Sequence, residues 1–260
     1  MTQKKQSPLK DNPLRNPGQT LDEEISKTIG DDAAPYILAP VVSIAFAGLE
    51  WWRWHMETPP SPIILTLVAC VITAVSIYKL LGYRKHVIRL RLGRDGERAV
   101  GQYLELLREK GYRVFHDLVG DNFNLDHVIV CAHGIYVIET KTYSKNERGT
   151  QKIVFNGNEI IVNGFNTGEK IVTQANAQAK WLQTIIKDST GKSFPVKPVV
   201  VFPGWYIESK KTQQNNLWVL NPKALPAYIG NAPKSLANED VTLVSFHISR
   251  FIRVSQGLKP

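Results

Sequence analysis

Leu125-Asp126-His127-Val128-Ile129-Val130-Cys131, followed after a short turn by Ile135-Tyr136-Val137-Ile138-Glu139-Thr140-Lys141, is the stretch that decides the fold of this 260-residue chain. Both segments are rich in β-branched residues, and His133-Gly134 lies between them, so they predict an antiparallel β-hairpin. A two- or four-residue turn places Asp126, Glu139 and Lys141 on one face. Asp126 is then expected opposite Lys141, next to a Val128–Glu139 pair.

Two acids and an amine on an apolar face need a partner, because buried charge is costly. The first interpretation is a hard divalent cation held by oxygen atoms, a site suited to phosphodiester hydrolysis. Lys141 then positions water or offsets charge in the transition state. The alternative is a structural salt bridge between Lys141 and one of the acids.

The rest of the C-terminal region alternates between helical and strand patterns. Glu97 and Gln174 each begin the apolar stripe of an amphipathic helix, so both are expected at the same cluster. The expected elements are a helix over 94–110, strands over 112–118, 125–131 and 135–143, a hairpin over 152–162, a helix over 171–187, strands over 196–202 and 217–220, and helices over 222–229 and 238–253. This order predicts an α/β sandwich around one mixed sheet.

These motifs resemble those of the nuclease-related domain (NERD) family, within the PD-(D/E)xK nuclease superfamily. The similarity rests on 93–97 (Gly-Arg-Asp-Gly-Glu), 126–130, 134–141 and, more weakly, Gln174-Ala175; Leu125 stands where the superfamily pattern has proline. The resemblance implies a restriction-endonuclease-like fold, a mixed sheet flanked by helices. It also implies Mg²⁺ or Mn²⁺ as cofactor. The implied residues are Asp126, Glu139 and Thr140 as metal ligands, Lys141 as catalytic lysine, and Glu97 and Gln174 as supporting catalytic positions.

Two apolar segments near the N-terminus predict a transmembrane hairpin ahead of this domain. Residues 33–49 and 58–78 contain no charged side chain, and a helix needs about 20 apolar residues to cross a bilayer. The cluster Trp51-Trp52-Arg53-Trp54 between them is typical of a membrane interface. We therefore expect spanning helices near 33–54 and 60–82; the alternative is a buried helical hairpin of a soluble protein.

Basic residues indicate which side of the membrane the termini occupy. The connector carries only Arg53, whereas six basic residues follow the second apolar segment: Lys79, Arg84, Lys85, Arg89, Arg91 and Arg94. The positive-inside rule then places both termini in the cytoplasm. We expect a polar cytoplasmic tail over 1–32, with a short helix capped near Thr20, the hairpin over 33–83, and a cytoplasmic nuclease domain over 84–260, in a multi-pass protein of the inner (cytoplasmic) membrane.

The charge is uneven along the chain. The net charge is +9, and residues 84–260 hold 25 Lys and Arg against 15 Asp and Glu, which favours a polyanionic partner such as DNA. A basic but merely soluble domain, or one attracted to the bilayer, has the same composition. The leading hypothesis is thus a membrane-anchored, Mg²⁺-dependent nuclease acting on nucleic acid, DNA first. The alternative is a catalytically inactive nucleic-acid-binding or scaffold module of a membrane-associated mobile element or transport system.

Overall fold

A computed structural model of the chain describes residues 14–56, 62–120, 123–145, 152–157, 159–162, 165–166, 168–209 and 216–255. Internal contacts divide the chain into two units. One is Thr20–Leu92, and the other joins Met1–Gln19 to Gly93–Pro260.

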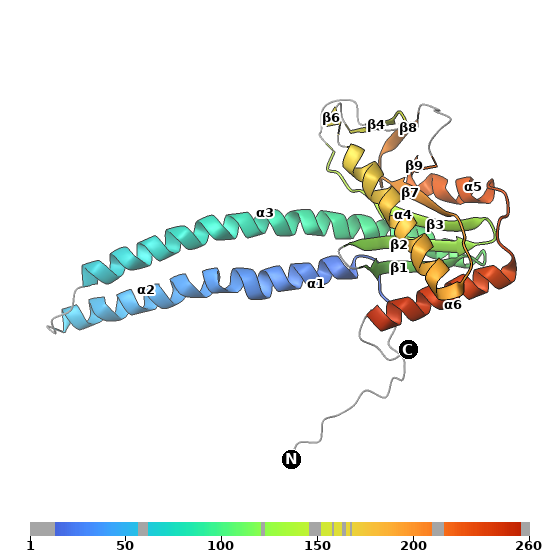
Figure 1. Cartoon of the computed structure of the whole chain (residues 1–260). Coiled ribbons are helices and arrows are strands. Elements are labelled where there is room, and N and C mark those ends of the chain that lie inside the picture. Colours follow the sequence, from blue (N-terminus) through green and yellow to red (C-terminus); the bar gives the residue numbers. More distant parts are fainter. Residues whose placement is uncertain are drawn as a thin grey trace, which may run out of the picture. The chain divides into compact units, whose positions relative to one another are not determined.

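The first unit is a helical hairpin. Helix α1 (Gln19–Lys27) continues through a π-helical turn, η1 (Thr28–Ala33), into α2 (Ala34–His55), and the chain returns along α3 (Pro62–Arg108). The two arms run antiparallel (Figure 1), with Trp51 Nε1 donating to Thr66 Oγ1 at 2.9 Å near one end and the Tyr36 and Tyr83 rings 5.8 Å apart near the other. The short helix expected near Thr20 is present as α1, and the helical conformation continues through η1. One expectation was wrong, because α3 is one continuous helix instead of a membrane span followed by a separate helix over 94–110.

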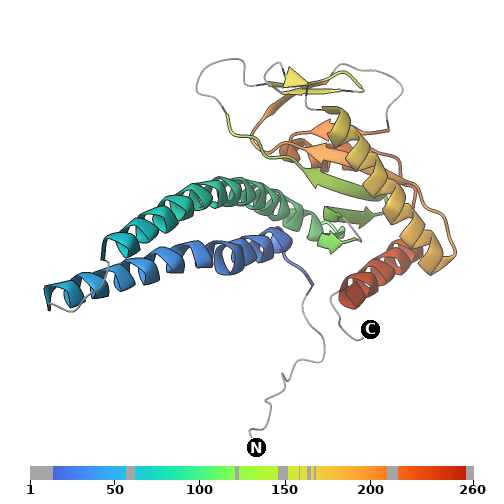
Figure 2. The same ribbon diagram turned by 60° about the vertical axis from the view of Figure 1, so that its left-hand side comes forward.

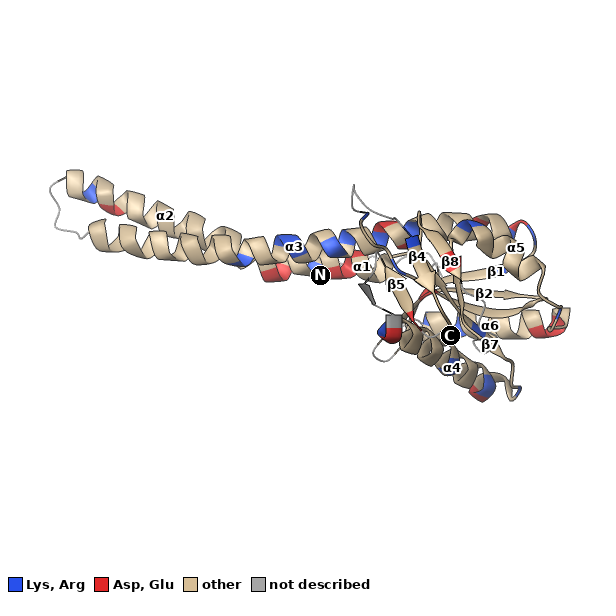
Figure 3. Ribbon diagram, turned by 90° about the horizontal axis from the view of Figure 1, so that it is seen from above, with Lys and Arg blue, Asp and Glu red and all other residues tan. Residues whose placement is uncertain are grey.

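The side chains of this hairpin are unlike those of a soluble core. Both helices are long and apolar enough to cross a membrane, and only 11% of the most apolar window of each is buried. Figure 3 shows that charged residues are sparse along α2 and the first half of α3 and become frequent further along α3. The start of the predicted second span, residues 58–61, lies outside the described residues.

The second unit contains a five-stranded mixed sheet in the order β1-β2-β3-β7-β9 (Figure 2). Its strands are β1 (Arg113–Val119), β2 (Asn124–Cys131), β3 (Gly134–Thr140), β7 (Val196–Val201) and β9 (Trp218–Leu220). β1, β2 and β3 are antiparallel neighbours, whereas β7 is parallel to both β3 and β9. Since β2, β3 and β7 are covered on both faces, they read as nearly continuous apolar runs.

Helices cover both faces of this sheet. On one face, Leu182 of α4 (Gly168–Thr190) and Val244 of α6 (Asn238–Ser255) pack against Val128 and Val137. On the other face, Leu104 from the end of α3 and residues of α5 (Leu225–Gly230), which follows the 3₁₀ turn η2 (Pro222–Ala224), form the second core. The mixed α/β class inferred from the sequence is confirmed.

A second, small sheet was not foreseen. It has the order β6-β5-β4-β8 and consists of β4 (Lys152–Phe155), β5 (Ile160–Val162), β6 (Phe165–Asn166) and β8 (Tyr206–Ser209). The predicted hairpin over 152–162 supplies β4 and β5, although Asn158 of its turn lies outside the described residues. β8 escaped prediction because it pairs with a strand about 50 residues earlier in the chain.

Candidate active site

The β2–β3 hairpin turns tightly and thereby aligns two carboxylates. Ala132 and His133 form a two-residue turn, after which Gly134 has φ +139°, a conformation that glycine adopts readily. His127 pairs with Ile138, and this register continues to place Asp126 opposite Glu139. The predicted Asp126–Lys141 pairing was wrong by two residues. An even shift keeps side chains on the same face, so the grouping of Asp126 with Glu139 survives.

Glu139 is the centre of a polar network inside the sheet. Its side chain is almost fully buried, and its Oε1 accepts hydrogen bonds from Lys141 Nζ at 2.6 Å and Gln174 Nε2 at 2.8 Å. Its Oε2 accepts a bond from Gln178 Nε2 at 2.6 Å. Lys141 Nζ also donates to Gln174 Oε1 at 3.2 Å. Lys141, just after β3, and two glutamines of α4 therefore hold one carboxylate in a fixed orientation.

Asp126 closes the end of the hairpin ladder. Its Oδ2 accepts the backbone N–H of Thr140 at 2.6 Å, and Thr140 Oγ1 is buried without a hydrogen-bond partner. Burial first, and then the charges of Glu139 and Glu97, raise the pKa of Asp126 well above its usual range. Negative charge is thus in excess around Asp126.

Glu97 enters the same cluster from α3. Burial, then the nearby charges of Asp117 and Glu139, raises its pKa to about 8. Gly96 explains how the helix comes so close, because a Cβ at this position would lie 1.7 Å from Thr142 Oγ1, just after β3. The glycine before Glu97 in the sequence motif is therefore required by packing.

Lys141 is the cation of the cluster. Burial favours its neutral form, but the charge of Glu139 and its hydrogen bond to that carboxylate outweigh burial and raise the Lys141 pKa. The amine stays protonated at neutral pH. We call the six residues Glu97, Asp126, Glu139, Lys141, Gln174 and Gln178 the carboxylate cluster.

Gln178 was not foreseen as a site residue. It is 2% exposed and bridges Glu139 to the carbonyl oxygen of Asn124 at 3.0 Å, while its own Oε1 is buried without a partner. The signal was present in the sequence, since Gln178 follows Gln174 by one helical turn on the same stripe. Glutamine on an apolar stripe at that spacing fits a shared polar partner inside the sheet.

The histidine next to Asp126 belongs to a different network. His127 is fully buried on the opposite face, and its Nδ1 lies 2.8 Å from Nδ1 of His116, whose Nε2 lies 2.9 Å from Glu105 Oε1. Burial, followed by the neighbouring His116, lowers the His127 pKa well below its usual range. His127 is therefore a packed, neutral histidine.

Residues 92–203 match the sequence model of the nuclease-related domain family, NERD. The family resemblance inferred from the motifs is confirmed, and all six residues of the carboxylate cluster lie within the matched range. An uncharacterized protein of Bacillus anthracis is 33% identical over 93 residues, which are 34% of this chain and 41% of that protein. The match thus spans less than half of that relative's length. No solved structure matches the chain. At this level the NERD match supports a nuclease-related function involving nucleic acid.

The donor set of the NERD domain fits a hard divalent cation. Asp126 and Glu139 offer carboxylate oxygens, and the partnerless Gln178 Oε1 adds a neutral oxygen beside them. Burial first, and then the charges of neighbouring carboxylates, raises the pKa values of Asp126 and Glu97, so a cation would relieve both effects. Among the described residues, no group of three or more His, Cys, Asp or Glu side chains has a geometry suited to a metal ion. Neutral oxygens and water would therefore complete any such site.

Proposed function

We propose that this chain is a membrane-anchored, Mg²⁺-dependent nuclease that hydrolyses phosphodiester bonds of nucleic acid, in the first place DNA. The NERD match supports the nuclease-related part. The observation that carries the rest is the arrangement around Glu139, which has Asp126 across the hairpin and Lys141 two residues along the strand. The mixed sheet with helices on both faces is consistent with a PD-(D/E)xK nuclease fold.

Each residue of the cluster has a chemical role in this proposal. Asp126, Glu139 and Thr140 would hold Mg²⁺ or Mn²⁺, which supplies polarisation of the phosphate and a lower pKa for a water molecule. Lys141 keeps its proton at Nζ and uses its N–H groups to stabilise negative charge on the phosphate oxygens. Gln174 holds Glu139 and Lys141 in position through its amide group.

The excess of negative charge favours catalysis over a purely structural ion pair. A salt bridge between Lys141 and Glu139 needs only those two charges, whereas Glu97 and Asp126 are two further carboxylates beside them. Burial first, and then the charge of Glu139 among others, raises the pKa of both Glu97 and Asp126. Burial of additional carboxylates is unfavourable in a structural element and useful in a cation site.

One observation favours the second candidate, an inactive nucleic-acid-binding or scaffold module. Both carboxylate oxygens of Glu139 already accept hydrogen bonds from side chains of the chain itself. A site of this kind is satisfied without a metal. The two candidates differ in whether a divalent ion binds and whether cleavage follows.

The membrane anchor rests on helices α2 and α3. The 22 residues of α2 span about 33 Å at 1.5 Å per residue, enough for the hydrocarbon core. The basic residues after the second apolar segment support a cytoplasmic location of the nuclease-related domain, at the inner membrane, by the positive-inside rule.

Cleavage by the full-length chain in detergent tests the catalytic proposal. Supercoiled plasmid, linear duplex and single-stranded DNA, and RNA are incubated with Mg²⁺, with Mn²⁺ and with EDTA. We expect metal-dependent cleavage that Asp126→Asn, Glu139→Gln and Lys141→Ala each abolish. Control chains with matched changes at the exposed end of α4, Asp188→Asn and Lys187→Ala, should cleave the nucleic acid as the parent chain does.

The outcomes separate the candidates. Cleavage that persists in EDTA, or in the Lys141→Ala chain, contradicts the proposed mechanism. Salt-sensitive nucleic-acid binding without cleavage in any metal, together with no calorimetric signal for Mg²⁺ or Mn²⁺, identifies the inactive module instead.

A further inference from the structure

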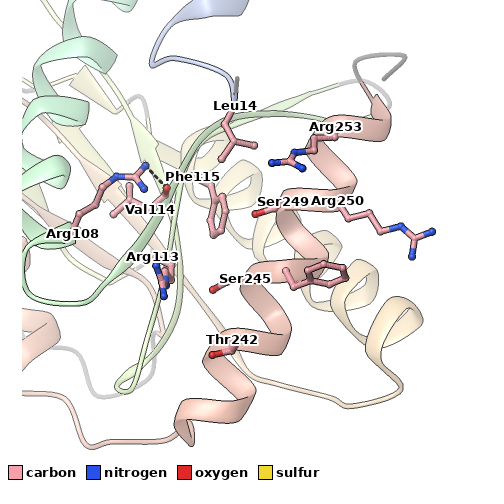
Figure 4. Close-up of a pocket in the computed structure, with 11 residues that line it drawn as sticks. Leu14, Arg108, Arg113, Val114, Phe115, Thr242, Ser245, Ser249, Arg250 and Arg253 are labelled. Carbon is pink, nitrogen blue, oxygen red and sulfur yellow. Dashed lines mark hydrogen bonds between the residues drawn. The ribbon is translucent and has the colours of Figure 1, made fainter. Parts of the chain in front are cut away.

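A hollow lies in the second unit, between edge strand β1 and helix α6 (Figure 4). Its volume is about 780 Å³, within the range of small-molecule sites. Its lining comes from three places: Leu14, the segment from Arg108 to Phe115, and α6 from Thr242 to Arg253. None of the residues of the carboxylate cluster lines it.

Small hydroxyl side chains on α6 create this space. Val244 and Ile248 face the core, whereas Thr242, Ser245 and Ser249 lie on the neighbouring stripe at helical spacing and face the strand. Figure 4 shows their hydroxyl groups directed toward β1. Larger side chains at these three positions would fill the gap between the helix and the edge strand.

The hollow carries a high density of positive charge. Four arginines contribute to its lining, and none of the lining residues within the described part of the chain is Asp or Glu. The arginines are Arg108, Arg113, Arg250 and Arg253. Arg108 is partly neutralised, since its Nε lies 2.7 Å from Glu105 Oε2 and its guanidinium also donates to the Val114 carbonyl oxygen. Guanidinium groups are the side chains best suited to bidentate binding of phosphate.

A buried hydroxyl points to a missing ligand. Ser245 is 9% exposed, lines the hollow, and its Oγ has no hydrogen-bond partner. A buried polar atom without a partner is unfavourable, and most such atoms in native proteins are satisfied. A ligand oxygen in the hollow would give Ser245 Oγ the hydrogen-bond partner that it lacks.

Aromatic groups complete the lining. Phe115 is buried against the hollow, whereas Phe246 is 62% exposed and also lines it. A flat apolar group attached to a phosphate could pack against an aromatic ring while the arginines bind the phosphate. The concave lining from three segments of the chain suits a compact molecule better than an extended polymer.

We propose that this hollow binds a phosphorylated small molecule of nucleotide size, with the phosphate held by arginines of the lining and the ring beside Phe115. This site is independent of the carboxylate cluster and of any cleavage that the cluster performs. Nucleic acid itself is the competing occupant.

Calorimetric titration of the full-length chain in detergent tests the proposal. Adenosine monophosphate is the probe, with adenosine and inorganic phosphate as its two fragments, and EDTA keeps divalent cations away from the carboxylate cluster. We expect saturable binding of the monophosphate, weaker binding of phosphate, and none of adenosine.

Two kinds of variant locate the binding. The double change Arg113→Gln with Arg253→Gln should lower the affinity for the monophosphate by about 10-fold or more, because charge-assisted hydrogen bonds are lost. Ser249→Leu should weaken binding by narrowing the hollow without a change in charge. Lys180→Gln with Lys187→Gln removes the same charge from exposed positions of α4 and should bind like the parent. Melting temperatures establish that each variant is folded.

Several results would overturn this assignment. They are the absence of saturable binding by the parent chain, equal binding by the arginine pair variant and the lysine pair variant, or undiminished binding by folded Ser249→Leu. Binding of a DNA oligonucleotide that depends on Arg113 and Arg253, when the monophosphate does not bind, would assign the hollow to nucleic acid instead.

Discussion

The pH dependence of stability in the metal-free chain tests the carboxylate cluster most directly. Glu97 has a pKa of about 8 in the folded chain and an ordinary value of 4.5 when exposed. The folded state therefore binds this proton more tightly than the unfolded state does. The resulting stabilisation is fully present below pH 4.5 and is lost as the pH rises to about 8.

The size of the effect follows from these two values. Between them the free energy of unfolding falls by up to about 1.4 kcal/mol per pH unit. From pH 5 to pH 7 the loss due to Glu97 is roughly 2–3 kcal/mol. For a domain of this size, 1 kcal/mol corresponds to about 2–4 °C in melting temperature. Glu97→Gln should remove this part of the pH dependence, because the amide does not ionise.

Thermal unfolding of the full-length chain in detergent and EDTA, at pH 5 and pH 7, measures the difference. At pH 5 the parent and Glu97→Gln should melt within about 2 °C of one another, and at pH 7 the variant should melt about 5–10 °C higher. Glu109→Gln, an exposed acid just after α3, is the matched control and should follow the parent. Mg²⁺ at pH 7 should raise the parent's melting temperature. Parallel pH curves for parent and Glu97→Gln would refute the electrostatic account of the site.

Three further predictions concern other parts of the molecule. Glu139→Gln should lower the free energy of unfolding of the metal-free chain by about 1.5–3 kcal/mol, because the half-buried Lys141 ammonium loses its carboxylate partner and keeps only the Gln174 oxygen. Chemical unfolding in EDTA measures this, and Asp126→Asn, whose charge is already disfavoured, should be neutral or stabilising at pH 7. Gly96→Ala should cost about 1–3 kcal/mol by forcing α3 away from Thr142, and a variant that melts like the parent would disprove this close packing. Reporter fusions after residue 56 and at the C-terminus should report opposite sides of the membrane; a full-length chain that stays soluble without detergent would contradict the anchor.

Local sequence patterns were sufficient to locate many of the strands and helices. The strands over 112–118 and 125–131 and the helix over 171–187 were located within a few residues of β1, β2 and α4. Each of these has a strong periodicity because one or both of its faces are buried in a core. β8 has no such periodicity, because its residues are largely half-buried or exposed. It pairs with β4, a strand that is distant in the sequence.

The site was predictable in composition and less so in geometry. Alternation along the strands grouped Asp126 with Glu139, but the position of the turn determined which residue faces which. A two-residue turn at Ala132-His133, rather than one centred on His133-Gly134, places Glu139 opposite Asp126. Gln178 was visible only as part of a helix stripe. Its role depends on α4 packing over β3, which brings its amide within 2.6 Å of Glu139.

The resemblance to the NERD family, the mixed α/β class, the two apolar helices and the side-chain types at the site could all be inferred from the amino-acid sequence, because periodicity, run length and motif spacing are local properties of the chain. The hydrogen bonds of Glu139, the raised pKa values of Glu97 and Asp126, and the arginine-lined hollow between β1 and α6 depend on the tertiary structure. These features arise where segments distant in the sequence exclude water together, and burial and mutual distance, rather than residue identity, set the energies of their charges.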